Sequence, residues 1–107
     1  MKPEALTIED VSGSQDGVRI LRLKGPLLIS NLFDFQTKVR TDTSSSLVID
    51  FTDVPYIDSA GIGALVGANV SRQKENGRSL MLKGVNQRVR QALQVTHVEQ
   101  FFKFKDA

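Results

Sequence analysis

The chain has 107 residues, 40% of them hydrophobic and 24% charged, a composition typical of one globular domain, and we expect residues 1–107 to form a single domain. The formal net charge is only +2, with basic and acidic residues interspersed, so the charge does not indicate direct binding of nucleic acid. The absence of cysteine excludes disulfides and thiolate chemistry. No apolar run resembles a signal peptide or reaches the length of a membrane span, which predicts a cytoplasmic protein that is not membrane-spanning.

The first third of the chain has the pattern of a β-hairpin followed by a short helix. Residues 6–11 and 18–23 alternate apolar and polar side chains, and residues 13–17 between them begin and end with glycine, as a turn does. A glycine–proline pair ends the second strand, and Ser30 or Asn31 can cap a helix. One face of that helix is formed by Leu32, Phe35, Gln36 and Val39.

The rest of the chain alternates short apolar strands with helices. Residues 47–51 have the pattern of a strand buried on both faces. Asp58 can cap a second helix that stops near Asn76 and Gly77, and residues 80–82 predict another interior strand. The last expected elements are a third helix capped by Asn86, with Val89 and Leu93 one turn apart, and a short strand with Phe101, Phe102 and Phe104.

This order, ββαβαβαβ, predicts an α/β fold with a mixed β-sheet. The opening hairpin supplies antiparallel pairing, and the following βα units imply parallel strands joined by right-handed crossovers. About three to four helices would pack on the sheet. Whether they cover one face or both is left open by the sequence.

The junction between the buried central strand and the second helix carries the densest signal. Ligands and partners meet open α/β sheets at such junctions. If Asp58 is the N-cap, Ser59 takes the first helical position, with its hydroxyl near the surface and near the positive end of the helix dipole. Ala60, Gly61 and Gly63 are small for a helix, and each interior glycine costs up to about 1 kcal/mol relative to alanine. Either the domain's own sheet or another protein's backbone therefore approaches closely there.

The same segment lacks the residues of an enzyme site. A serine hydrolase elbow needs glycine two residues before the serine, where Ile57 stands, and the only histidine, His97, lies in a polar turn. Gly61 and Gly63 lack the third glycine of a dinucleotide fingerprint, because Val66 occupies its place. We expect no catalytic residue, no cofactor and no metal. The nearby acids are interpreted as a strand-end acid, a turn former and a cap: Asp50, Asp53 and Asp58.

Covalent modification is the chemistry that suits Ser59. A phosphoryl group adds about −1.5 to −2 charges. The N-terminus of a helix favours anions, so the fold would tolerate the group. Beside Asp58, on a flat surface lined by glycine, the same group would repel a closely packed partner. Phosphorylation of one residue is therefore expected to switch one interface.

These residues resemble the STAS domain family and, within it, the small stand-alone anti-sigma factor antagonists. The matching pattern is Ile49-Asp50-Phe51 at a strand end, then Val54-Pro55-Tyr56-Ile57, then residues 58–63 at a helix start. Weaker similarity extends over nearly the whole chain. One departure is Leu28, which stands where many members have the aspartate of a G-x-L-D pattern. The apolar residues at that place either form a docking patch or, for at least two of them, pack in the core: Leu28, Ile29, Leu32 and Phe33.

The resemblance implies a binding module of a partner-switching pathway that regulates transcription, not an enzyme. It implies that the chain binds an anti-sigma factor, itself a serine kinase, while Ser59 is unphosphorylated, and that a serine phosphatase reverses the kinase. Two alternatives stay open: a STAS accessory subunit of a lipid or anion transporter, and a subunit of a sensory complex. We expect a monomer or weak dimer. The residues implied in partner binding are Asp58, Ser59, Ala60, Gly61, Ile62 and Gly63.

Overall fold

The elements of the computed structural model, which describes residues 5–12, 17–75 and 77–105, follow the predicted order ββαβαβαβ. A 3-10 helix (Glu99–Phe101) precedes the last strand. The expected turn residues 13–16 and the expected helix stop at Asn76 lie outside the described residues. The other elements are β1 (Thr7–Asp10), β2 (Val18–Lys24), α1 (Leu32–Thr41), β3 (Ser46–Asp53), α2 (Ser59–Lys74), β4 (Ser79–Lys83), α3 (Gln87–Val95) and β5 (Lys103–Lys105).

The strands form one mixed sheet in the order β1-β2-β3-β4-β5. The hairpin strands β1 and β2 pair antiparallel, with Ile8 opposite Leu23. The three other pairs are parallel, and their register sets Val48 between its neighbours Ile20 and Met81. The predicted α/β class with an N-terminal hairpin is therefore confirmed.

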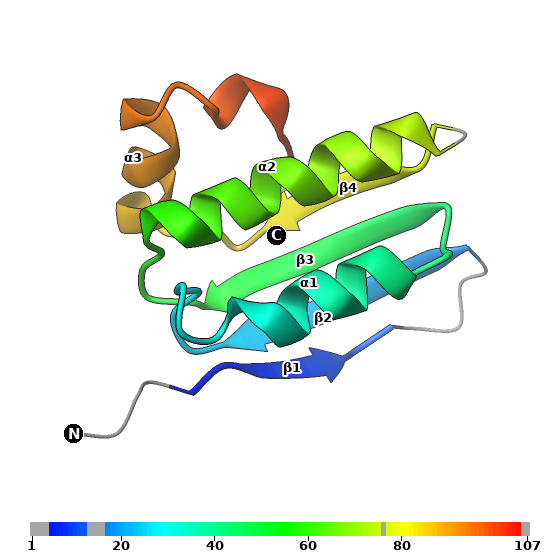
Figure 1. The fold of residues 1–107 in the computed structure, drawn as a ribbon, viewed down its shortest axis with the longest axis horizontal. Coiled ribbons are helices and arrows are strands. Elements are labelled where there is room, and N and C mark those ends of the chain that lie inside the picture. Colours follow the sequence, from blue (N-terminus) through cyan, green and yellow to red (C-terminus); the bar gives the residue numbers. More distant parts are fainter. Residues whose placement is uncertain (1–4, 13–16, 76, 106–107) are drawn as a thin grey trace.

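The α-helices of the described residues lie over one face of the sheet. Each parallel connection moves one strand further in the same direction, and right-handed crossovers then place α1, α2 and α3 on the same side. Phe35, Leu65 and Leu93, one from each helix, belong to a single buried cluster. Figure 1 shows α1 and α2 side by side in front of the sheet, with their first turns at the same end.

The central strand β3 is buried on both sides, as its sequence predicts. Leu47, Ile49 and Phe51 are fully buried in the core under the helices. Val48 and Asp50 alternate with them and so face the other side, where they are nevertheless almost completely buried. Burial of this kind fixes β3 firmly, and the segment that follows it therefore starts from a rigid support.

Two local predictions need correction. Phe101 and Phe102 were expected in the last strand, but Phe101 ends the 3-10 helix, where its N–H bonds to the carbonyl of Val98, and Phe102 is the C-cap of that helix. The Asn69 side chain holds the Phe101 carbonyl at 2.8 Å, so the strand begins only at Lys103. Asn31 precedes α1 as expected but makes no side-chain cap; its Oδ1 instead accepts the N–H of Leu28 at 2.9 Å.

No helix in the described part of the chain is long and apolar enough to cross a membrane.

Candidate functional site

The segment between β3 and α2 is a short connection that the rest of the fold anchors. Val54 and Ile57 bury their side chains, and Ile57 forms a parallel bridge with Leu27, which follows β2. The side-chain amide of Asn86, at the start of α3, donates to the carbonyl of Val54 at 3.0 Å. The start of α2 is thus held from two sides.

Asp58 joins two loops through one carboxylate. Its Oδ1 accepts the N–H of Gly61 at 2.8 Å, which is the N-cap bond predicted from the sequence. Its Oδ2 accepts the N–H of Ile29, in the loop before α1, at 3.0 Å. The loop that opens α1 and the first turn of α2 are therefore one connected unit.

Ser59 is the first residue of α2 and is exposed. The backbone N–H groups of a first helical turn lack intrahelical partners and carry the positive end of the dipole. An oxygen on Ser59 therefore lies where added negative charge is tolerated. No other hydroxyl residue occupies this first turn, because Ala60, Gly61 and Ile62 follow.

The glycines of α2 have two different causes. A Cβ at Gly61 would collide with the backbone carbonyl oxygen of Leu27, so this glycine permits close approach within the fold. A Cβ at Gly63 or Gly67 would meet nothing within 4 Å. The sequence offered two explanations for these glycines: close approach within the domain, or close approach of another protein. Close approach within the domain explains Gly61 but not Gly63. Gly67 was not recognised from the sequence, although it lies one turn after Gly63 on the same helix face.

Exposed apolar side chains border this site. Ile29 and Phe33 are 76% and 72% exposed. Leu28 and Leu32 are partly buried, and Leu32 packs against the core. Of this four-residue apolar group only Leu32 packs against the core, one residue fewer than the two expected, whereas Ile29 and Phe33 are presented beside the start of α2.

The surroundings of Asp50 and His97 agree with the structural interpretations made from the sequence. Burial raises the pKa of Asp50, but hydrogen bonds from the Thr52 hydroxyl and N–H and from Arg22 outweigh it, so the pKa lies below its usual value. His97 is exposed in the turn after α3, where the sequence predicted a surface histidine. Within the described ranges, no group of three histidines or acids has the arrangement of a metal site.

The strand before Asp58, the helix that Asp58 caps and the Ser59 that begins it all lie within residues 12–107, and over these residues the chain matches the STAS domain family model. The chain belongs to the STAS domain family. The resemblance inferred from the motif at residues 58–63 is thereby confirmed.

Solved structures share this STAS fold. The Thermotoga maritima protein TM1081 is 24% identical with a TM-score of 0.79, over 95% of this chain and 86% of that one. The anti-sigma factor antagonist SpoIIAA in its unphosphorylated form is 20% identical with a TM-score of 0.71, over 95% and 87% of the two chains. A sulfate transporter family protein from Wolinella succinogenes is 23% identical with a TM-score of 0.64, over 87% and 80%. At these identities the likeness establishes the fold.

Proposed function

We propose that this STAS domain is an anti-sigma factor antagonist whose binding is switched by phosphorylation of Ser59. In its unphosphorylated state it binds an anti-sigma factor that is also a serine kinase, and so frees the sigma factor. The observation that carries the proposal is the exposure of Ser59 at the first position of α2, directly after its cap Asp58.

Electrostatics supplies the switch. The kinase transfers the γ-phosphoryl group of ATP to the Ser59 oxygen, which adds about −1.5 to −2 charges. The first turn of α2 accommodates that charge because its N–H groups carry the positive end of the helix dipole. A partner packed against the same turn meets a bulky dianion next to the Asp58 carboxylate and is repelled. A serine phosphatase restores the binding surface.

The six residues proposed for partner binding play different roles. Asp58 fixes the loop geometry through its bonds to Gly61 and Ile29, and Gly61 lets the helix start lie on Leu27. Ile62 is buried, so it supports the surface from within. Ser59, Ala60 and Gly63 are the members left to face a partner, since each is at least partly accessible.

On this proposal the domain is a kinase substrate and not an enzyme, and it needs no cofactor. It acts in the cytoplasm as a monomer or weak dimer. The fold likeness to SpoIIAA agrees with this assignment, and that protein is known in a phosphorylated form as well, with a TM-score of 0.69 and 20% identity to this chain.

Intact-mass measurement tests the proposal. The kinase is purified from the native cell by following ATP-dependent phosphorylation of this chain, and peptide mapping locates the phosphate. We expect one phosphoryl group on Ser59, none on Ser59→Ala, and loss of kinase binding by Ser59→Asp with an unchanged circular dichroism spectrum. A phosphate mapped to another residue, or a Ser59→Asp variant that binds like the wild type, would refute the assignment.

A second candidate is an accessory subunit of a lipid or anion transporter. It is supported by the fold likeness to the Wolinella succinogenes sulfate transporter family protein. The identity of the bound partner separates the two: a transporter ATPase supports this candidate, and a serine kinase supports the first. A large sensory complex would instead appear as a high-mass species in gel filtration.

A further inference from the structure

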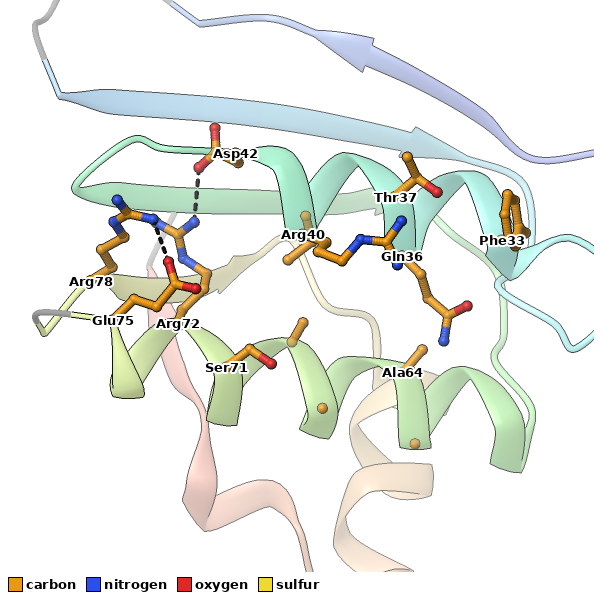
Figure 2. Close-up of a pocket in the computed structure, with 14 residues that line it drawn as sticks. Phe33, Gln36, Thr37, Arg40, Asp42, Ala64, Ser71, Arg72, Glu75 and Arg78 are labelled. Carbon is orange, nitrogen blue, oxygen red and sulfur yellow. Dashed lines mark hydrogen bonds and ion pairs between the residues drawn. The ribbon is translucent and has the colours of Figure 1, made fainter.

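A groove of about 370 Å³ runs along the outer seam of α1 and α2. Figure 2 shows its two walls, with Gln36 reaching from α1 toward α2 and with Ala64 and Ser71 on the α2 side. The α1 wall is formed by Phe33, Gln36, Thr37 and Arg40. The α2 wall is lined mainly by small residues, among them Gly63, Gly67 and Ser71.

The fold itself does not require the two glycines that open this groove. Each is about 1 kcal/mol less favourable than alanine in a helix interior. A Cβ at either position would meet nothing within 4 Å. Packing within the domain therefore does not offset the lower helix propensity of these glycines. The open groove is therefore a feature that folding alone does not explain.

The shape of the groove suits an α-helix. Gly63, Gly67 and Ser71 are spaced by four residues, so they form one straight row along α2. That row spans about 12 Å at 1.5 Å per residue, the length of about two helical turns. Small side chains in such a row let a second helix approach closely, and the ridge of that helix fits the depression.

The charge of the groove selects the occupant. Arg72 is buried and paired with Asp42, and Arg78 is paired with Glu75. Among the described residues, the exposed Arg40 is the lining cation without an ion pair. Phe33 stands two turns before it on the same helix face and is 72% exposed. The α1 wall thus presents an apolar anchor, Phe33, and a free positive charge, Arg40, while paired charges of Arg72, Glu75 and Arg78 close the end away from Phe33 (Figure 2).

We propose that this groove receives an amphipathic α-helix of the anti-sigma factor kinase, with apolar side chains toward Phe33 and an acidic side chain that pairs with Arg40. The inference rests on the proposed function. The groove begins at Gly63, one turn after Ser59, so a helix seated in it is continuous with the surface that phosphorylation would alter. Its acidic residue meets a cation that the fold leaves available.

The test uses the full chain and the kinase purified through its phosphorylation of Ser59. Gly67→Gln places a side chain in the groove two turns away from Ser59, at a position where a Cβ meets nothing within 4 Å. We expect this variant to unfold no more easily than the wild type and to bind the kinase at least about tenfold more weakly. Val70→Gln is the matched control, because Val70 is exposed on the same helix but does not line the groove; its affinity should stay within about twofold of the wild type.

Charge and kinetics provide the second readout. Arg40→Glu should weaken kinase binding and Arg40→Lys should retain most of it, because only the first reverses the charge. In phosphorylation assays Gly67→Gln should raise KM while kcat changes little, since the groove does not touch the transferred phosphate. Wild-type affinity for Gly67→Gln, together with loss of binding by Ser59→Asp, would overturn the groove assignment alone. If Ser59→Asp leaves kinase binding intact, the proposed function is overturned and this inference with it.

Discussion

The guanidinium of Arg72 and the carboxylate of Asp42 form an ion pair of 2.8 Å with side chains only 4% and 1% exposed. The same guanidinium donates to the carbonyls of Ser44 and Ser79 at 2.8 and 3.0 Å. Arg72 thereby ties the end of α2 to the connection before β3 and to the start of β4. Its position is fixed from three directions, and this holds the far end of the groove in place.

Removal of one partner from this pair should be strongly destabilising. Asp42→Ala leaves a buried guanidinium without its carboxylate, which typically lowers the free energy of unfolding by about 3–5 kcal/mol. Urea denaturation measures the change. The comparison is Glu75→Ala, which breaks the exposed pair with Arg78 and should cost at most about 1 kcal/mol. Similar losses in the two variants would contradict the role given to Arg72.

The Asp58 carboxylate should matter through both of its oxygens. Asp58→Ala removes the cap of α2 and leaves the Ile29 N–H without its acceptor, and a lost cap alone costs about 0.5–2 kcal/mol. Asp58→Asn keeps one acceptor oxygen, so its loss in unfolding free energy should be smaller. Amide hydrogen exchange provides the local check, because Asp58→Ala should speed exchange at Gly61 and at Ile29 together. Faster exchange at Gly61 alone would show that the two loops are not coupled.

Two glycines two residues apart should respond to alanine with opposite signs. Gly61→Ala forces a Cβ against the Leu27 carbonyl, so we expect a lower melting temperature. Gly63→Ala adds a methyl group in open space and should stabilise the domain by up to about 1 kcal/mol, the difference in helix propensity. Thermal unfolding of both variants beside the wild type decides the matter. Destabilisation by both would mean that Gly63 also serves internal packing.

Acid stability should depend on Asp50. Its pKa in the folded state lies below the usual 3.8, since the bonds from Thr52 and Arg22 outweigh burial. A carboxyl whose pKa is lowered by folding contributes stability above pH 3.8, and this is lost as the pH falls through the lowered value. The advantage of wild type over Asp50→Asn in unfolding free energy should therefore shrink below pH 3.8. Thr52→Val should raise the Asp50 pKa in an NMR titration; an unchanged value would show that the Thr52 hydroxyl does not act on it.

The fold could be predicted because its signals are local. Alternating and continuous apolar runs identify strands, and the apolar run at 47–51 correctly indicated burial on both faces. The last strand was misplaced at Phe101 because its conformation depends on a hydrogen bond from Asn69, a residue distant in the sequence. Asn31 was placed correctly, but its side chain turns back to Leu28, and no propensity distinguishes these two uses.

The site was predictable only in part, because some of its features depend on residues that are distant in the sequence. The cap bond from Asp58 to Gly61 spans three residues and follows from residue type and spacing. The different causes of Gly61 and Gly63 depend on where Leu27 lies, which the segment itself does not encode. The groove needs two helices in a defined arrangement, and a glycine pair at a spacing of four was the one visible trace of it.

The single-sided placement of the helices has a practical use. Every feature proposed for docking and switching lies on the helical side, while Lys103 on β5 is exposed and pairs with Met81, which faces away from the helices. Because the chain contains no cysteine, Lys103→Cys would be a unique attachment point for a fluorophore. A probe there reports on complex formation from the face opposite the helices and does not lie between the domain and its partner.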